Sequence, residues 1–291
     1  MAWLSCKPGG VYLDCTLGQG GHAALVLDRS GPDGILIGVD RDPDAIAETA
    51  ANLTRFASRT RLVRGNFSAL KQHLRSVGVS EVDGVIFDLG VSSAQLDRPE
   101  RGMSFLSDGP LDMRMDQSGG RTAAELIGRL PERELADLIY HYGEEHYSRR
   151  IARAIVASRK THPLRTTFDL ASAVSGAVPA VYRHGRIHCA TRTFQALRIA
   201  VNQELDVIAG AIRDAVDVLA PGGRLCIISF HSLEDRIAKQ TFRSLAQGPE
   251  GRLKILTKKP QMASDEECRS NPRARSAKLR VAEKLPEGRP R

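Results

Sequence analysis

Short apolar runs rich in β-branched residues alternate with helical patterns over residues 11–90. The runs are VYLDCTL, ILIGVD, RLVRGNF and DGVIFDLG, and the segments between them, such as AIAETAANLTRF, repeat apolar residues at helical spacing. Strands separated by helices in this way are typical of βαβ units, in which a crossover helix links two parallel strands. The pattern therefore predicts an α/β fold built on a parallel sheet.

The alternation stops after Gly90. Residues 91–121 are loop-like, and residues 122–218 are almost purely helical in pattern, as in TAAELIGRL and SRRIARAIVASRK. Strand signals return in GRLCIISFH at residues 223–231 and, after a further helix, in LKILT and AKLRVAEKL. The simplest account is a sheet domain with a helical insertion. We expect residues 1–105 and 206–291 to form the sheet domain, and residues 106–205 to form the inserted all-helical domain.

A glycine-rich turn, DCTLGQGGHAALVL at residues 14–27, lies between the first predicted strand and the first predicted helix. Its glycines add no side chain to a core and cost backbone entropy on folding, so we infer that something approaches the backbone closely there. The helix N-terminus offers free N–H groups to an anionic or carboxylate-bearing ligand. Asp40 ends the second strand, where a carboxylate can accept hydrogen bonds from two ribose hydroxyls. The turn and Asp40 together predict a nucleoside cofactor.

Two classes of cofactor fit this turn. The pattern Gly18-x-Gly20-x-x-Ala23 matches the relaxed dinucleotide fingerprint of nicotinamide-dependent dehydrogenases. Against that reading, Asp14 precedes the glycines where an S-adenosylmethionine site commonly places an acid near the methionine ammonium. The later strands also end in candidates for adenine or methionine recognition, namely Asp40, Phe67 and Asp88. A methyltransferase is favoured, and the dehydrogenase is the alternative.

Each of these residues also has a purely structural explanation. Phe67 is more often a core residue than an adenine platform, and Asp40 or Asp88 could cap the helix or turn that follows. Only their joint placement at successive strand ends favours a binding site. The last two strand signals also favour a methyltransferase, because they would complete a seven-stranded sheet with an antiparallel final strand, as in methyltransferases.

The charge of the chain indicates a polyanionic partner. Its 291 residues carry a net charge of +8 at pH 7, and phosphate contacts dominate nucleic-acid affinity. Residues 251–291 hold twelve Lys and Arg against five Asp and Glu, and residues 183–198 hold four Arg and two His. A solvated basic tail explains the first stretch equally well, but the two stretches together favour an RNA or DNA surface. An RNA-binding protein without catalysis is thus a third hypothesis, which the intact Gly20, Asp40 and Asp88 disfavour.

The apolar pattern of the chain indicates that the protein is neither secreted nor membrane-spanning. The N-terminal residues show no signal-peptide pattern, and no apolar run approaches the length of a membrane span. The cysteines show no C-x-x-C pair and no nearby His cluster, so we expect reduced cytoplasmic thiols and no structural metal. They are Cys6, Cys15, Cys189, Cys226 and Cys268.

Eight motifs in order along the chain resemble the ribosomal RNA small subunit methyltransferase H family. They are DCTLGQGGH, IGVDRDPDAI, GNF, DGVIFDLGVSSAQLD, RGMSF, LDMRMD, SFHSLEDR and NPRARSAKLR. The resemblance implies transfer of a methyl group from S-adenosylmethionine to the exocyclic N(4) amine of a decoding-centre (P-site) cytidine in bacterial 16S rRNA of the small ribosomal subunit. It also implies a Rossmann-like class I methyltransferase sheet carrying an inserted helical substrate-recognition domain. A monomer and a homodimer are equally compatible with the sequence.

The resemblance also implies the cofactor contacts, residue by residue. They fall on the glycine turn, the strand ends and the loop beyond: Gly20, Gly21, His22, Asp40, Phe67, Asp88 and Gln95. The chain departs from the family by lacking an upstream H-x-P-V-L stretch, so it is either shortened or does without that segment. It also reads D-L-G-V at residues 88–91, where many amino-group methyltransferases carry [DNS]-P-P-[YF]. The choice of an amine as acceptor therefore comes from the resemblance alone.

Asp88 is the first candidate for the chemistry. The lone pair of a cytosine amine is delocalised into the ring, and a group that accepts one of its N–H bonds would restore electron density on the nitrogen. Ser92, Ser93 and His231 would lie near the same sheet edge, which makes His231 a second catalytic candidate. A polar residue bonded to backbone explains His231 equally well.

Two further expectations concern the surroundings of this chemistry. Ser232 and Asp235 fit a capping-box pattern, so the SFHSLED stretch needs no catalytic explanation. A base inside a duplex cannot reach a cofactor in a cleft, so the cytidine must be single-stranded or turned out. We expect the helical insertion and the basic tail to hold the surrounding RNA.

Overall fold

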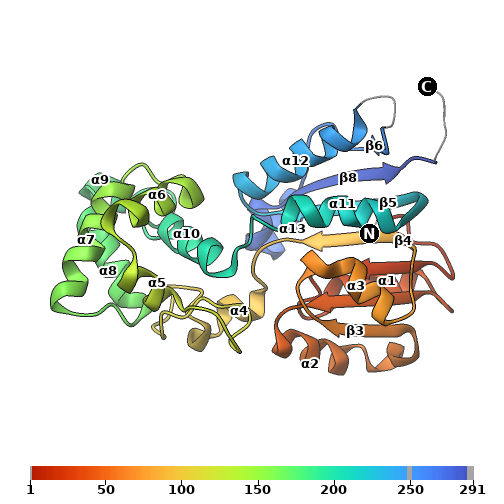
Figure 1. Cartoon of the computed structure of the whole chain (residues 1–291), viewed down its shortest axis with the longest axis horizontal. Coiled ribbons are helices and arrows are strands. Elements are labelled where there is room, and N and C mark those ends of the chain that lie inside the picture. The colour runs from red at the N-terminus through yellow and green to blue at the C-terminus, as the bar shows by residue number, and fades with distance from the viewer. Residues whose placement is uncertain (1, 248–250, 287–291) are drawn as a thin grey trace. The chain divides into compact units, whose positions relative to one another are not determined.

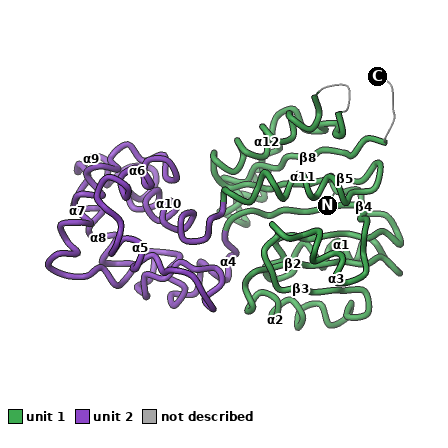
Figure 2. Tube along the Cα trace, in the orientation of Figure 1, with its two compact units in different colours: residues 1–90, 205–291 green, residues 91–204 purple. Residues whose placement is uncertain are grey.

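The chain forms two compact units, each with its own hydrophobic core. The computed structural model describes residues 2–247 and 251–286. Unit 1 combines residues 1–90 with residues 205–291, and unit 2 is residues 91–204 (Figure 2). The sequence pattern placed the first boundary at residue 106, whereas unit 2 begins at Val91. The reason is that side chains of the loop-like stretch, among them Leu96, Met103 and Phe105, pack into the helical core of unit 2.

Unit 1 is an α/β structure, as the sequence predicted. Within the described residues its strands form an eight-stranded sheet in the order β3-β2-β1-β4-β5-β8-β6, with β7 paired to β8. Strands β1 to β5 run parallel, and β8 is antiparallel to β5, β6 and β7. The bounds are β1 (Val11–Asp14), β2 (Ile35–Asp40), β3 (Thr60–Arg64), β4 (Val82–Asp88), β5 (Leu219–Ser229), β6 (Leu253–Ile255), β7 (Gln261–Met262) and β8 (Lys278–Lys284).

The antiparallel final strand is confirmed, and the expected count of seven strands is wrong by one. The additional strand is β7, which has two exposed residues and leaves no hydrophobic pattern in the sequence. It pairs with the first residues of β8, Lys278 and Leu279. The pairing therefore extends the sheet only at the end where β8 begins.

Helices cover both faces of this sheet (Figure 1). Adjacent strand residues point to opposite faces, so Leu13 and Phe87 enter one core cluster while Tyr12 and Ile86 enter the other. Burial on both faces explains why the strands read as continuous apolar runs. The helical segments are α1 (Gly21–Arg29), α2 (Pro43–Asn52), η1 (Thr54–Arg59), η2 (Phe67–Ala69), α3 (Leu70–Ser76), α11 (Ile208–Val218), α12 (Ser232–Ala246), α13 (Asp265–Ser270) and η4 (Pro272–Ser276).

The carboxyl edge of the sheet collects several polar strand ends. Asp14 closes β1, Asp40 closes β2, Asp88 closes β4 and Ser229 closes β5. These strands are parallel, so their carboxyl ends meet at one edge. In open α/β sheets, ligands bind outside this edge.

Unit 2 consists of helices and loops, apart from one isolated bridge between Pro110 and Thr166. Leu135 and Ile139 of α6 pack with Ile151 and Ile155 of α7 in a single core cluster, as their helical spacing predicts. The segments are α4 (Ser93–Asp97), η3 (Pro99–Arg101), α5 (Ala123–Arg129), α6 (Glu132–Gly143), α7 (Ser148–Thr161), α8 (Thr167–Ala177), α9 (Ala180–Arg183) and α10 (Thr191–Asn202). Among residues 2–247 and 251–286, no helix has the length and apolar character needed to cross a membrane.

Candidate active site

The glycine turn between β1 and α1 is fixed by side chains of β2 and α2. The Gly18 N–H donates to Asp40 Oδ2 at 2.9 Å, and Thr49 Oγ1 donates to the Gly18 carbonyl at 2.8 Å. Gly20 has φ +80°, and a Cβ there would lie 2.8 Å from Thr49 Cγ2. A Cβ at Gly21 would meet no atom within 4 Å. The turn is thus rigid behind Gly20 and open in front of Gly21, where a ligand can approach the backbone.

Asp40 supports the turn with both of its carboxylate oxygens. Oδ1 accepts from the Asp42 N–H at 2.9 Å, while Oδ2 binds the turn at Gly18. Burial raises the pKa of Asp40 above its ordinary value. The backbone groups of Gly18, Asp42 and Arg41 all donate to Asp40. An ionised carboxylate has about four acceptor positions, so capacity remains for a ligand.

The ends of β1 and β4 are joined through Thr16. The Thr16 N–H donates to Asp14 Oδ1 at 3.1 Å, and the Asp88 N–H donates to Thr16 Oγ1 at 2.6 Å. The sequence reasoning overlooked Thr16, although an Asp followed two residues later by such an N–H donor is the signature of an Asx-turn. Thr16 therefore sets the spacing between the two strand-end carboxylates.

Asp14 is completely buried, which raises its pKa to about 6. Its Oδ2 atom is buried and accepts no hydrogen bond from any described residue. A buried carboxylate oxygen is costly to leave unpaired. The position therefore suits a positively charged or N–H-bearing group of a ligand.

Asp88, like Asp14, has one buried carboxylate oxygen that accepts no hydrogen bond from a described residue. Its Oδ2 lies 3.3 Å from His22 Nε2, and the hydrogen bond to Asp88 raises the pKa of His22. The other oxygen, Oδ1, is buried and receives no hydrogen bond within the described chain. Because β1 and β4 are neighbours in the sheet, the unpaired carboxylate oxygens of Asp14 and Asp88 belong to adjacent strand ends, and Asp88 also contacts His22, which follows the glycine turn.

Phe67 follows the third strand at the same edge. It starts η2, and its ring stands edge-on to Phe87 with the centroids 5.5 Å apart. Phe67 is half-buried and packs against the core cluster that contains Phe87. The residue is therefore part of the core and also remains accessible at the sheet edge.

His231 is the N-cap of α12, which corrects the expected capping box. The box joins His231 to Glu234, one residue before the predicted Ser232 and Asp235. Asp235 instead holds Arg280 through two hydrogen bonds of 2.6 and 3.1 Å, and this ion pair removes it from capping. His231 Nδ1 accepts from the Glu234 N–H at 3.4 Å, and Nε2 lies 3.0 Å from Glu234 Oε1. The contact of Nδ1 explains His231 as a structural residue, whereas the buried Nε2 makes no hydrogen bond within the described chain. The role of His231 in proton removal stays a prediction.

The predicted site residues belong to unit 1, except for Gln95. Gln95 belongs to unit 2, where its side chain and that of Ser92 form the capping box of α4 at 3.1 and 3.2 Å. Its predicted contact with a cofactor stays a prediction. The other predicted residues lie at the carboxyl edge of unit 1: Gly20, Gly21, His22, Asp40, Phe67, Asp88 and His231.

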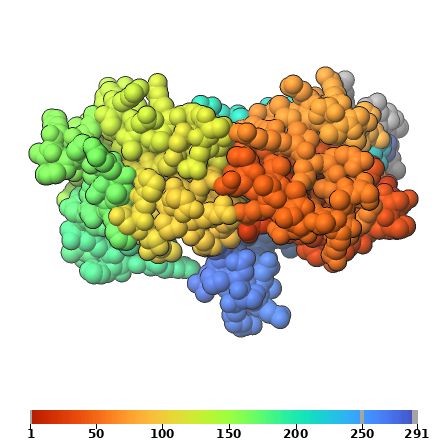
Figure 3. All heavy atoms as spheres, turned by 90° about the horizontal axis from the view of Figure 1, so that it is seen from below, coloured from red at the N-terminus to blue at the C-terminus, as the bar shows by residue number. Residues whose placement is uncertain are grey.

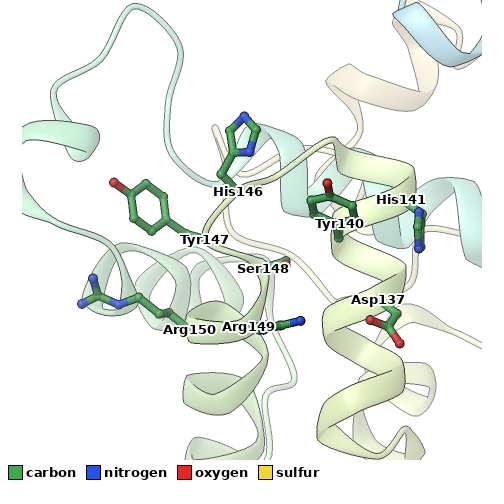
Figure 4. A pocket seen from close by; sticks show the side chains of 8 residues that line it. All are labelled: Asp137, Tyr140, His141, His146, Tyr147, Ser148, Arg149 and Arg150. Atoms are coloured by element: carbon green, nitrogen blue, oxygen red, sulfur yellow. The ribbon is translucent and has the colours of Figure 1, made fainter.

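Unit 2 has a surface pocket of its own between α6 and the start of α7 (Figure 4). Its volume is about 490 Å³, and tyrosine, histidine and arginine side chains line it together with one acid and one serine: Asp137, Tyr140, His141, His146, Tyr147, Ser148, Arg149 and Arg150. Arg150 lies 5.9 Å from the centroid of the Tyr147 ring. The sequence offered one signal for this pocket, since HYGEEHYSRR at residues 141–150 contains two tyrosines, two histidines and two arginines. Such a surface suits unstacked bases and phosphates.

Comparison with known proteins identifies the family. The family model described as "MraW methylase family" matches residues 1–285. The chain belongs to the MraW methylase family. This family membership confirms the resemblance found in the sequence motifs.

Relatives of this MraW-family chain share about half of its residues. A protein from Geobacter sulfurreducens is 52% identical over 98% of this chain and 96% of its own length. A protein from Syntrophus aciditrophicus is 49% identical over 98% of this chain and 95% of its own length. Both are named "Ribosomal RNA small subunit methyltransferase H". A solved structure, a putative rRNA methylase from Clostridium thermocellum, has a TM-score of 0.47 and 13% identity over 97% of this chain and 90% of that chain.

Proposed function

We propose that this protein is a cytoplasmic S-adenosylmethionine-dependent methyltransferase of small-subunit ribosomal RNA. Its proposed acceptor is the N(4) amine of a decoding-centre cytidine in 16S rRNA, as the family resemblance implies. The observation that carries the proposal is the pair of unpaired carboxylate oxygens, on Asp14 and Asp88, beside the open glycine turn. The names of the relatives supply the substrate class.

The residues at this edge fit S-adenosylmethionine better than a dinucleotide. S-adenosylmethionine carries an ammonium and a sulfonium, and two buried carboxylates in one site favour positive charge. A dinucleotide would bring its pyrophosphate to the same turn, where Asp14 and Asp88 would repel it. Asp40 has acceptor positions left for the ribose hydroxyls, and Phe67 offers an apolar surface for adenine. The dehydrogenase alternative is therefore disfavoured.

Asp88 is proposed to accept a hydrogen bond from the cytidine amine. The bound cofactor supplies an electrophilic methyl group, so the protein mainly has to hold the amine nitrogen in line with it. His22 occupies Asp88 Oδ2 and fixes the orientation of the carboxylate, which leaves Oδ1 for the amine. Formation of the new N–C bond would break the bond between the methyl carbon and the sulfonium sulfur, which would leave as a neutral thioether, and the amine would release one proton. Asp88 is the proposed acceptor of that proton.

Unit 2 is proposed to recognise the RNA around the target cytidine. Its pocket between α6 and α7 combines Tyr140, Tyr147 and the two guanidinium groups of Arg149 and Arg150 (Figure 4). Aromatic faces bind unstacked bases, and guanidinium groups bind phosphates and stack on rings. This supports the expectation that the helical insertion contacts single-stranded RNA.

The direct test of the function is methylation of unmodified small-subunit RNA. Purified protein is incubated with that RNA and isotopically labelled S-adenosylmethionine, and the digested RNA is analysed by mass spectrometry. The proposal expects one labelled N(4)-methylcytidine in the decoding-centre fragment. Label on another base, or no transfer to RNA, would overturn the assignment.

Replacing Asp40 with alanine is expected to weaken cofactor binding by about 1.5 to 3 kcal/mol, since hydrogen bonds to a charged group are lost. This corresponds to a rise in Kd of at least about tenfold, measured by calorimetry. Asp44→Ala is the matched control, because Asp44 is an exposed carboxylate in the first turn of α2. Equal affinities for the two variants would remove Asp40 from the cofactor site.

Cofactor affinity is expected to fall as the pH drops below about 6. Burial raises the pKa of Asp14 to about 6, and a cationic ligand binds only its ionised form well. The affinity should therefore be constant above that pH and decrease by up to about tenfold per pH unit below it. Calorimetry across this range measures the effect.

The contribution of Asp14 can be separated from that of its neighbour His22, whose pKa is raised by its hydrogen bond to Asp88. Asp14→Asn should bind the cofactor more weakly and with little dependence on pH, whereas His22→Asn should keep the dependence. If Asp14→Asn keeps the wild-type pH profile, another group is responsible for it.

A further inference from the structure

The segment that links β6 to β8, residues 256–277, stands at the carboxyl edge of the sheet. Strand β8 begins at Lys278, which pairs with Ser229 at the end of β5. The residue before Ser229, Ile228, pairs with Asp88 of β4 on one side and with Leu279 of β8 on the other. The start of β8 therefore lies two strand spacings, about 10 Å, from the end of β4. Figure 1 shows α13 at this edge, and Figure 3 shows the segment as a blue projection.

This segment is ordered by its own contacts. The Val281 N–H of β8 donates to Thr257 Oγ1 at 2.8 Å, and this hydrogen bond holds the first residues of the segment against β8. Ser264 caps α13, and the side chain of Asn271 caps η4. Ala274 is buried. These contacts fix the backbone conformation of the segment, and with it the positions from which its other side chains extend.

The charges of the segment are separated in space. Residues 256–278 contain six Lys and Arg against three Asp and Glu. The acids, Asp265 to Glu267, all lie in the first turn of α13, where they stabilise the helix N-terminus. Four of the exposed cations lie outside that turn and form no ion pair within the described residues: Lys258, Lys259, Arg269 and Arg275.

The edge beside these cations is itself acidic. Asp14, Asp40 and Asp88 end neighbouring strands there. An RNA that places a base at Asp88 brings its flanking phosphates to this carboxylate-rich edge, where they are repelled unless cations stand nearby. The 256–277 segment supplies exposed cations at this edge, since it ends where β8 begins at Lys278.

We propose that the 256–277 segment binds the phosphate backbone of the substrate RNA next to the target nucleotide. This inference rests on the proposed function, because it takes RNA as the substrate. Its cations contact phosphates and read no base, so they set affinity and position rather than sequence. The segment is thereby an RNA-docking surface of unit 1, separate from the pocket of unit 2.

The test uses the full-length protein with paired charge-neutralising variants. One variant carries Lys258→Gln and Lys259→Gln, and a second carries Arg269→Gln and Arg275→Gln. The matched control carries Arg61→Gln and Arg75→Gln, which remove two exposed cations at the start of β3 and the end of α3, at the opposite edge of the sheet. The probe is unmethylated small-subunit RNA transcribed in vitro.

The measured quantities are the RNA Kd over a series of salt concentrations and the cofactor Kd. Each segment variant should weaken RNA binding by about tenfold at the lowest salt and reduce the slope of log Kd against log salt by about 1.4, since each phosphate contact on single-stranded RNA contributes about 0.7. The cofactor Kd should be unchanged, and the control pair should keep the wild-type slope.

Two results would overturn the inference in different ways. If the wild type methylates RNA and the segment variants keep the slope of the control, the segment does not contact phosphates, and the proposed function stands. If the wild type neither binds nor methylates the RNA, the proposed function fails, and the docking surface fails with it.

Discussion

Asp88→Asn is expected to lower the rate of methyl transfer by roughly a hundredfold or more, in the range of positioned acid–base groups. The amide oxygen can still accept from His22, whose ring lies 3.3 Å from Asp88 Oδ2. The amide NH₂ group then takes the place of Oδ1 and points a donor at the cytidine amine, where the carboxylate offered an acceptor. Cofactor affinity should change less than the rate.

Single-turnover methylation at saturating cofactor and RNA separates the chemical step from binding. Asp83→Asn is the matched control, because Asp83 lies at the amino end of the same strand and accepts from the Val11 N–H at 2.8 Å. Near-normal turnover in Asp88→Asn would leave Asp88 with only a binding or structural role.

Removing residues 91–204 and joining Gly90 to Leu205 through a short flexible linker is expected to abolish RNA methylation while cofactor binding persists. The core clusters of unit 1 contain no residue of unit 2, so the sheet keeps its packing. The deletion also removes Gln95, which the family resemblance places among the cofactor contacts. Loss of one hydrogen bond from its amide should lower cofactor affinity by only about 1 kcal/mol.

Two measurements control this experiment. Thermal unfolding reports whether the shortened chain is folded, and Gln95→Ala in the full chain gives the effect of that side chain alone. A folded deletion variant that methylates the RNA at the normal rate would show that unit 2 is not the recognition unit.

The parallel part of the sheet could be predicted well from the sequence. The run ILIGVD became β2 with the expected bounds, because a strand buried on both faces is a continuous apolar run that ends where the chain turns polar. The clustering of Asp14, Asp40 and Asp88 also followed from topology alone, since parallel strands end at one edge. These features depend on local patterns and on general rules of chain connection.

The features that could not be predicted depend on side-chain partners far apart in the chain. Ser232 and Asp235 fit the capping-box pattern, but Asp235 forms an ion pair with Arg280. The capping box is instead formed by His231 and Glu234. Thr16 joins two strand ends that are distant in sequence. The early start of unit 2 likewise depends on where apolar loop residues are buried, which spacing does not reveal.

Unit 1 is assembled from two stretches of chain, and this has a consequence for how the protein folds. The pairing of β4 with β5 joins Asp88 to Ile228, so it cannot form until all of unit 2 has been synthesised. Contacts of such long sequence separation carry a loop-closure cost and slow folding. Early folding of unit 2 around its own core would shorten the effective loop. During synthesis on the ribosome, strands β1 to β4 are therefore complete while the edge of β4 that will pair with β5 is still unpaired. This nascent state is the one most exposed to aggregation and most dependent on chaperones.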